Sequence, residues 1–272
     1  MKKYKLIDSG DNLKLEQFGK YSVVRPSAYA LWSPLLQTKW KQVDFSFSRK
    51  GEKKWEGKDL FASWSTEIEN ILFKLKLTPF GHLGVFPEHQ FVWNYIRKKI
   101  TKKNQNILNL FAYTGGATLA SALAGAKVCH VDASKPVISW AKENAALNGL
   151  QDAPIRYISD DVFKFLKREI KRKVKYDGII LDPPTFGRGT QNEVFKLEKD
   201  ISLLMNLCKD LLSEDPSFVI FTSHTFSFTP KVLENLLKQF FPSYDKISSG
   251  ELIIDSEKSY SLSSGTYCIA EW

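Results

Sequence analysis

The amino-acid sequence predicts an α/β protein with a mostly parallel main sheet and a small mostly-β domain in front of it. From about residue 87 onward, short apolar segments alternate with stretches of helical character, which is typical of repeated βαβ units. Earlier residues form short aromatic and β-branched pieces interrupted by Gly, Pro and Ser, with no long helical period. The last two apolar segments are joined by a loop too short for a crossover helix, so the sheet should end in an antiparallel pair.

This change in texture divides the chain into two predicted domains. Residues 1–80 form a small mostly-β N-terminal domain and residues 81–272 form the larger α/β domain, with the boundary between Phe80 and Pro87. The N-terminal strand candidates, which alternate apolar and polar residues at least in part, are Tyr21–Arg25, Val43–Phe47 and Ile71–Leu77.

In the larger domain, five apolar segments are each followed by a helical stretch. These strand candidates are Ile107–Phe111, Lys127–Val131, Ile155–Ile158, Tyr176–Leu181 and Ser217–Ser223. The final antiparallel pair is predicted at Lys246–Ile254 and Thr266–Trp272. One helix has clear end signals, because Ser134 can cap it, Pro136 fits its first turn and Gly149 follows its last turn.

Composition favours a globular protein with a polyanionic partner. The chain has 272 residues and 43% hydrophobic content, and Lys plus Arg exceed Asp plus Glu by 39 to 30. The densest basic run, Lys164–Lys175, has seven basic residues around Glu169 and is interpreted as the solvated face of a surface helix. No apolar run reaches the ~18 residues of a membrane span, and the start lacks a signal peptide's apolar stretch. We therefore expect no membrane partner and a cytoplasmic location.

The cysteines do not form a metal or redox motif. Cys129, Cys208 and Cys268 are widely separated, and none is part of a CxxC pair. We expect all three to be reduced and buried, and we expect no metal site.

A glycine-containing loop follows the first strand of the larger domain. The segment Asn109–Gly116 runs from an apolar strand into a glycine pair and then an alanine-rich helix. Glycine lets the backbone approach a ligand closely, and the helix N-terminus offers free N–H groups. The loop residues expected to contact a cofactor are Phe111, Ala112, Tyr113, Thr114, Gly115 and Gly116. A nucleotide-binding dehydrogenase would also use such a loop, although the GxGxxG spacing is absent.

Acidic residues follow the next two strands. Asp132, in the stretch Asp132–Ser134 that includes Ala133, can accept both ribose hydroxyls of an adenosine, or it can simply start the following helix. After the third strand, Asp160 or Asp161, in the segment that continues into Val162, can accept an adenine amino group. The acid that does not touch the ligand would then cap the helix.

The fourth strand ends in Asp182-Pro183-Pro184, followed by Thr185 and Phe186. Two prolines cannot continue a sheet ladder, so they fix a rigid turn at the strand's carboxyl end, where open α/β sheets bind ligands. An ordinary strand-ending turn is the alternative, but it is disfavoured after three strand ends that suit a ligand.

These four elements together resemble the class I S-adenosylmethionine-dependent methyltransferases, which have a Rossmann-like sheet with an antiparallel last strand. In that family the glycine loop holds the methionine part of the cofactor, the second-strand acid the ribose and the third-strand acid the adenine. More narrowly, the motifs are similar to those of the large-subunit ribosomal-RNA methyltransferases that modify cytosine C5 or guanine N7. The resemblance covers roughly residues 80–272. Phe80–Glu88 also resembles the segment that enters their catalytic domain, with an interdomain linker as the alternative.

The resemblance implies S-adenosylmethionine as cofactor, but cytosine C5 is a disfavoured target. Cytosine-C5 methylation requires a cysteine thiolate, expected near the edge of the fifth strand. The corresponding stretch, Phe221–Thr225, has no thiol, and the three cysteines are placed on other elements. Transfer to nitrogen or oxygen remains, with Asp182 orienting the acceptor or taking its proton.

Other features leave the acceptor open. Adenine and glutamine N-methyltransferases usually have an aromatic residue directly after the two prolines, whereas here Thr185 precedes Phe186. His224 can act as a base or be a hydrogen-bonded strand-end residue. The residues expected to carry the reaction are Asp182, Pro183, Pro184 and Phe186.

The N-terminal domain mixes cations with aromatic residues, as surfaces for single-stranded RNA do and as a small β domain with buried tryptophans also does. These residues are Arg25, Trp32, Lys39, Trp40 and Lys41. The predicted function is methylation of a base in RNA, with ribosomal RNA as the expected substrate. The alternatives are a protein N-methyltransferase of the same fold, an NAD-dependent oxidoreductase and an RNA-binding protein with an inactive catalytic domain.

Overall fold

The computed structural model describes residues 3–48, 54–61, 63–188 and 194–272, which form two compact units. Unit 1 comprises Met1–Gln90 together with Leu252–Ser264, and unit 2 comprises Phe91–Glu251 together with Gly265–Trp272. Unit 1 is therefore built from two segments that lie far apart in the sequence.

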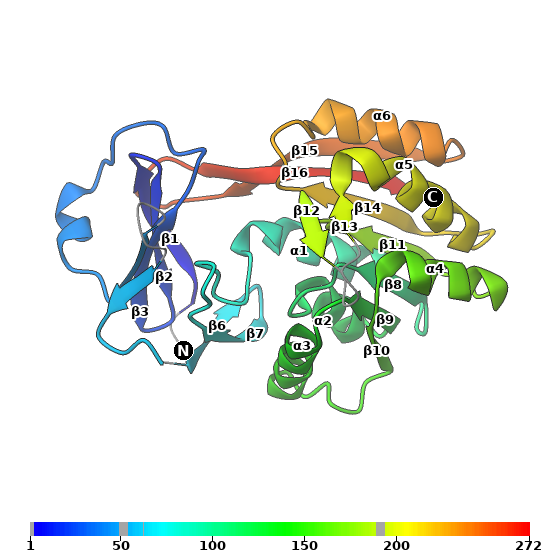
Figure 1. The fold of residues 1–272 in the computed structure, drawn as a ribbon, viewed down its shortest axis with the longest axis horizontal. Helices are drawn as coiled ribbons and strands as arrows, with labels where there is room; N and C mark the ends of the chain where they lie inside the picture. Colours follow the sequence, from blue (N-terminus) through cyan, green and yellow to red (C-terminus); the bar gives the residue numbers. More distant parts are fainter. Residues whose placement is uncertain (1–2, 49–53, 62, 189–193) are drawn as a thin grey trace. The chain divides into compact units, whose positions relative to one another are not determined.

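Unit 1 is rich in β-strands (Figure 1). Its five-stranded sheet has the order β1(Lys5–Gly10), β2(Leu13–Phe18), β3(Tyr21–Pro26), β4(Phe45–Ser48), β5(Lys54–Gly57), and a separate hairpin pairs β6(Ser63–Ile68) with β7(Ile71–Lys76). A short 3-10 helix, Gln37–Lys41, lies between β3 and β4, and another, Pro87–His89, follows β7. The three strands predicted from alternation correspond to β3, β4 and β7, whereas the other four strands were not predicted.

Buried polar contacts hold the interior of unit 1. Arg25 is only 5% exposed and its guanidinium pairs with Glu16, whose side chain is fully buried. Of the two interpretations left open by the sequence, an RNA-binding surface is therefore contradicted for Arg25. The Asp8 carboxylate accepts hydrogen bonds from the backbone N–H of Leu36 and the indole of Trp40, which fixes the loop after β3.

Unit 2 contains the predicted α/β sheet. Its seven strands have the order β10(Ile155–Ser159), β9(Lys127–Asp132), β8(Asn106–Leu110), β11(Gly178–Leu181), β14(Phe218–Ser223), β16(Leu262–Glu271), β15(Lys246–Ile254). The first five strands in this order are parallel, and β16 is antiparallel to β14. The predicted class I sheet is confirmed. β16 begins at Leu262, four residues before the predicted start, and its first residues belong to unit 1.

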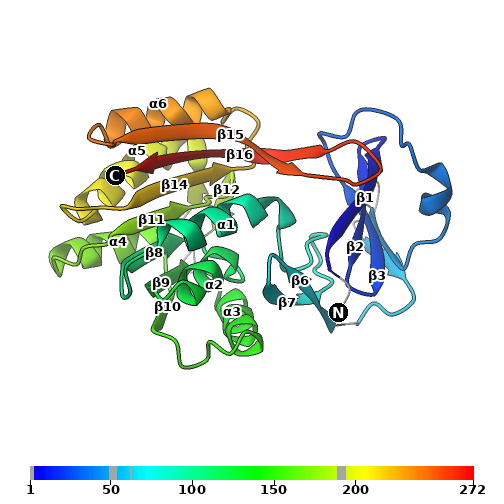
Figure 2. The same ribbon diagram turned by 180° about the vertical axis from the view of Figure 1, so that it is seen from behind.

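Helices cover both faces of this sheet (Figures 1 and 2). They are α1(Gln90–Lys99), α2(Gly116–Leu123), α3(Lys135–Leu147), α4(Val162–Lys171), α5(Leu197–Leu211) and α6(Pro230–Phe240). Apolar residues of α4, α5 and α6, among them Phe165, Met205 and Leu237, share one buried cluster with the strand residues Leu110, Ile179 and Phe221. The short hairpin β12(Phe186–Arg188) and β13(Val194–Lys196), which was not predicted, lies between β11 and α5.

The central strands of unit 2 are buried on both faces. All four residues of β11 and all six of β14 are buried, because helices pack on each side of a parallel sheet. The three cysteines are free and buried, as predicted. Among the helices that the structure describes, none combines the length and apolar character needed to span a bilayer.

Candidate active site

The polar residues singled out in the sequence follow strands of unit 2 that end side by side, at the same edge of the sheet. Register pairs Leu110 with both Val131 and Leu181, and it pairs Leu181 with Phe221. The residues that follow these strand ends therefore gather along the carboxyl edge of the sheet. The strand order reverses between β8 and β11, and this switch point is where open α/β sheets bind their ligands.

The loop after β8 has an unusual backbone. Phe111 and Tyr113 adopt left-handed φ angles of 56° and 49°, and Gly115 has φ 96° at the N-cap of α2. Such angles cost non-glycine residues about 1–3 kcal/mol and persist only where surrounding contacts impose them. The Ala112 N–H donates to the Val131 carbonyl at 3.0 Å, and the Asn144 amide donates to the Thr114 carbonyl at 2.9 Å. The loop is thus held in one shape by neighbouring elements.

Asp132 joins this loop to the start of α3. Its two carboxylate oxygens accept the backbone N–H groups of Tyr113 and Ser134, each at 2.9 Å. Burial raises the pKa of Asp132, although these two hydrogen bonds oppose the shift. A carboxylate oxygen has more than one acceptor site, so Asp132 can still accept hydroxyl groups from a ligand. Ser134 stands at the N-cap position of α3, as predicted, but its side chain makes no capping hydrogen bond.

A chain of buried polar groups lies beneath the loop. The Asn109 amide donates to the Thr118 hydroxyl, which lies 2.9 Å from Nδ1 of His130. The Thr118 proton is then free to point at the imidazole, which leaves His130 neutral. Burial lowers the pKa of His130 to about 3, against a smaller opposing effect of the Tyr113 backbone. This network ties β8, α2 and β9 together under the loop.

Gly116 allows α2 to start against an aromatic ring. A Cβ atom added at this position would lie 2.6 Å from Cζ2 of Trp93, which is almost fully buried. Real Cβ atoms do not approach another atom so closely, so only glycine fits this position without movement of the indole. The second glycine of the pair is therefore required by packing as well as by the loop.

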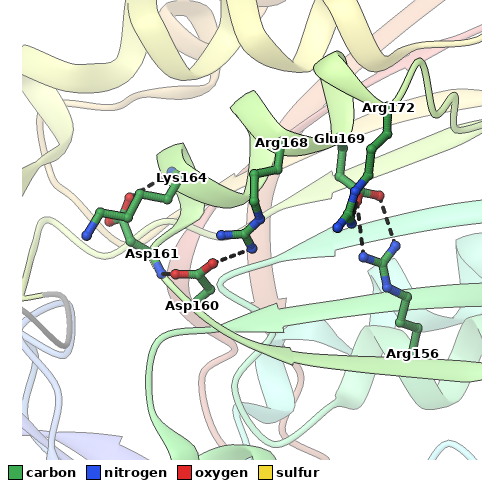
Figure 3. Close-up of polar contacts among 7 residues, drawn as sticks. All are labelled: Arg156, Asp160, Asp161, Lys164, Arg168, Glu169 and Arg172. Atoms are coloured by element: carbon green, nitrogen blue, oxygen red, sulfur yellow. Dashed lines mark hydrogen bonds and ion pairs between the residues drawn. The ribbon is translucent and has the colours of Figure 1, made fainter.

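The two acids after β10 have different partners (Figure 3). Asp161 caps α4, because its carboxylate accepts the Lys164 N–H at 3.0 Å. Asp160 pairs with the Arg168 guanidinium and also accepts the Asp161 N–H at 2.8 Å. The capping role that the sequence left open thus belongs to Asp161, whereas Asp160 is engaged by Arg168, about two helical turns further along α4.

The other half of the edge is built from the ends of β11 and β14. Thr222 donates its hydroxyl to Oδ1 of Asp182 at 2.7 Å, and Nε2 of His224 lies 4.0 Å from the same oxygen. The side chains of Asp182 and His224 are 27% and 34% exposed. A carboxylate that is fixed by one hydroxyl and open to solvent can orient an acceptor or take up its proton.

The residues after Asp182 leave the sheet. Pro183 is buried, whereas Pro184, Thr185 and Phe186 are exposed. The Thr185 and Thr225 hydroxyls lie 2.6 Å apart and link the two loops of this half. Phe186 is 51% exposed at the start of β12, so its ring is accessible to a planar partner.

None of the three cysteines has the properties of a nucleophile. Burial raises the pKa of Cys129 to about 11 and that of Cys268 to about 12, and it also raises the pKa of Cys208. All three lie within strands or helices, away from the strand-end loops. A thiolate mechanism therefore has no candidate residue in this chain.

Several residues that shape the site were not predicted from the sequence. Thr222 lies near the end of the apolar strand β14, and its polar side chain was the available signal. Asn144, Thr118 and His130 support the glycine loop from helices or strand interiors, where polar residues gave no motif. Their contacts depend on which elements pack together.

Comparison with known proteins shows what kind of protein contains this arrangement. A family model described as S-adenosylmethionine-dependent methyltransferase matches residues 31–226. A solved S-adenosylmethionine-dependent methyltransferase from Agrobacterium tumefaciens is 38% identical, with a TM-score of 0.93, over 100% of this chain and 91% of that one. A putative methyltransferase complexed with SAH (S-adenosylhomocysteine) is 18% identical, with a TM-score of 0.76, over 98% of this chain and 75% of that one.

A curated relative, the ribosomal RNA large subunit methyltransferase K/L of Shewanella frigidimarina, is 41% identical over 129 residues. This match covers 47% of the chain but only 18% of the relative, so the chain spans less than a fifth of that protein's length. The match to the family model covers well over half of the chain and agrees with the sheet order and the acids at the strand ends. The chain belongs to the S-adenosylmethionine-dependent methyltransferase family.

Proposed function

We propose that this methyltransferase modifies a base of RNA, with ribosomal RNA as the substrate, at a nitrogen or oxygen atom rather than at cytosine C5. The observation that carries the proposal is the Thr222-held carboxylate of Asp182 beside the loop after β8, in a site without a thiol nucleophile. The curated relative named for ribosomal RNA and the excess of 39 basic over 30 acidic residues support an RNA substrate.

We call the loop after β8 together with Asp132, Asp160 and Asp161 the cofactor half. Its groups suit S-adenosylmethionine, and each of these residues would have a role in binding it. The methionine part would lie against the loop, and Asp132 would accept the two ribose hydroxyls, since both of its oxygens are already oriented by backbone N–H groups. Asp160, Asp161 and Val162 would line the adenine. The loop residues proposed to bind the cofactor are Phe111, Ala112, Tyr113, Thr114, Gly115 and Gly116, with Ala133 and Ser134 beside the ribose.

We call the residues at the ends of β11 and β14, among them Asp182 and His224, the acceptor half, because they would hold the base. The bound cofactor supplies an electrophilic methyl group, and Asp182 positions the acceptor atom in line with it or takes the proton that the acceptor loses. Pro183 and Pro184 hold the turn in place, and the exposed ring of Phe186 offers a stacking surface. His224, close to Asp182, is a second candidate base.

The predicted N-terminal domain, residues 1–80, is proposed as an additional RNA-contacting part beside the methyltransferase domain, residues 81–272. Lys39 and Lys41 are exposed in the segment after β3. The Trp32 and Trp40 indoles donate hydrogen bonds inside unit 1 and leave both rings half-buried. We expect these lysines to contribute charge rather than sequence recognition.

The test is methylation of isolated RNA. Ribosomal RNA from cells that lack the gene is incubated with the protein and labelled S-adenosylmethionine, and its nucleosides are then analysed by mass spectrometry. One methylated nucleoside, absent from the untreated RNA and from reactions with Asp182→Ala, is expected. Label in protein fractions but not in RNA would instead establish a protein methyltransferase, and 5-methylcytosine as the product would overturn the proposed chemistry.

A further inference from the structure

The exposed side of α4 carries a dense group of cations. We define the α4 basic face as Arg156 of β10 together with Lys164, Lys167, Arg168, Lys171 and Arg172 of α4 and its C-cap, all of which are exposed. Residues 156–175 contain eight basic and three acidic side chains, a net charge of +5 in a chain whose total is +9. More than half of the chain's excess charge is therefore concentrated in this short segment.

The face lacks the alternating charges of an ordinary solvated helix. Glu169 is the single acid within α4, and its side chain is fully buried. It accepts two hydrogen bonds from Arg156, at 2.9 and 3.1 Å, one from Arg172 at 3.2 Å and one from the Tyr176 hydroxyl at 2.7 Å. Burial alone would raise the pKa of Glu169, but these hydrogen bonds outweigh the effect of burial. The pKa is therefore lowered and Glu169 stays ionised.

Two carboxylates thus hold three guanidinium groups in place (Figure 3). Glu169 holds Arg156 and Arg172, whereas Asp160 holds Arg168. The side chains of Arg156, Arg172 and Arg168 are still 46%, 58% and 47% exposed. Ordering these side chains costs little on binding, because their rotamers are already fixed by the anchors.

The cations follow the helical repeat. Lys164, Arg168 and Arg172 are spaced four residues apart and form one stripe with a rise of about 6 Å between neighbours. Lys167 and Lys171 form a second stripe beside it. α4 begins directly after Asp160 and Asp161 at the carboxyl edge of the sheet. The α4 basic face therefore starts at this edge and extends along the surface of unit 2.

We propose that the α4 basic face binds the phosphate backbone of the RNA substrate and holds it beside the reaction centre; this inference rests on the proposed RNA methyltransferase function. Fixed, planar guanidinium groups match phosphate geometry better than flexible ammonium groups do. Contacts to the backbone position an RNA without reading its sequence, which is left to the residues around Asp182.

The first test reverses charge on the second stripe and leaves the arginine anchors intact. The variant Lys167→Glu/Lys171→Glu is compared with Lys199→Glu/Lys209→Glu, a matched pair of exposed lysines on α5. Binding of a fluorescently labelled single-stranded RNA is measured over a range of salt. The α4 variant should lose about 10-fold or more in affinity, and its salt slope should fall by about 1.4 or more, since each backbone contact to a single strand contributes about 0.7.

The α5 variant should lose much less affinity for the RNA. Equal losses in both variants would show that only the total charge matters and would overturn the assignment to α4. Binding of the wild-type protein to anionic lipid vesicles but not to RNA would overturn it as well. Affinity for S-adenosylhomocysteine, measured by calorimetry, should be unchanged in both variants, because neither pair lies in the proposed cofactor site.

A second test separates guanidinium geometry from charge. Arg172→Lys keeps the cation but removes the planar fork, so RNA affinity should fall several-fold while the melting temperature changes little. Lys171→Arg, the matched control, should bind RNA at least as well as the wild type. Unchanged RNA affinity in Arg172→Lys would contradict a role for the anchored guanidinium groups.

Methyl-transfer kinetics distinguish this inference from the proposed function. In Lys167→Glu/Lys171→Glu, KM for ribosomal RNA should rise about 10-fold with little change in kcat, because the face binds substrate and touches no reacting atom. A wild-type protein that methylates no RNA would end the proposed function. A wild type that methylates RNA and a variant with the same KM would end only the assignment to α4.

Discussion

The two halves of the carboxyl edge in unit 2 are built in different ways. In the cofactor half, backbone N–H groups bind Asp132, and a buried chain from Asn109 to His130 supports the loop. In the acceptor half, Asp182 and His224 are about one-third exposed, and a threonine hydroxyl fixes the carboxylate. One half is held by hydrogen bonds and is largely buried, whereas the other is open to solvent.

This difference corresponds to the role that we propose for each half. A cofactor common to a whole family can be bound by a pre-organised backbone, which loses little entropy on binding. Under the proposed function the acceptor is part of a large RNA that has to enter and leave, so the groups that meet it need solvent access. Substitutions in the cofactor half should therefore affect binding and stability, whereas those in the acceptor half should affect turnover.

The largest expected effect is on turnover, and it distinguishes Asp182 from Asp132. Asp182→Ala should lower kcat by about 10²- to 10⁴-fold, the usual contribution of a positioned acid or base, and leave affinity for S-adenosylhomocysteine nearly unchanged. Asp132→Ala should weaken that affinity by about 100-fold, because two hydrogen bonds to a charged acceptor are lost. Calorimetry and single-turnover kinetics measure the two quantities. Equal loss of cofactor affinity in both variants would contradict the division of the edge into halves.

A second substitution tests the packing of the cofactor half. Gly116→Ala would place a Cβ atom 2.6 Å from the Trp93 ring, so the free energy of unfolding should fall by about 1–3 kcal/mol, and cofactor affinity should fall with it. Denaturant unfolding provides the measurement. Trp93→Leu removes the ring, so the double variant should be less destabilised than the sum of the two single variants. Additive effects would show that the contact does not exist.

A smaller effect is expected from the hydroxyl that fixes Asp182. Thr222→Val should lower kcat about 10-fold, since it removes one hydrogen bond to a charged group, with no change in affinity for S-adenosylhomocysteine. Thr222→Ser keeps the hydroxyl and should restore most of the activity. If valine and serine reduce kcat equally, the threonine acts through packing and is not a positioning residue.

The smallest effect concerns pH and the buried network. The pKa of His130 is near 6.5 in the unfolded chain but about 3 in the folded protein. Its contribution to the free energy of unfolding is therefore complete above pH 6.5 and is lost as pH falls. Between pH 7 and pH 5.5 the free energy of unfolding should drop by about 1 kcal/mol from this residue. Denaturant unfolding of His130→Gln should show a weaker dependence over this range. An identical pH dependence in both proteins would argue against a neutral, buried imidazole.

Much of the fold of unit 2 was predictable because its signals are local. Apolar segments, helix-starting residues and the proline pair each act within a few positions, and all five predicted βα strands are present. The hairpin of β12 and β13 and the strands β1, β2, β5 and β6 were not predicted, because strands of three to six residues with mixed patterns resemble loops in the sequence.

The sequence by itself determined that the main sheet is mostly parallel and which acids end its strands, since both follow from short-range patterns of βα units, whereas the strand order came from the structure. Only the tertiary structure decided which side chains meet across the chain. Thr222 reaches Asp182 over 40 positions, Asn144 reaches Thr114 over 30, and Arg25 turns inward to Glu16. Such pairs depend on register and on the packing of whole elements, and no local pattern encodes them. For the same reason the three arginines of the α4 basic face appeared in the sequence only as charges, whereas Glu169 and Asp160 hold them as a fixed surface.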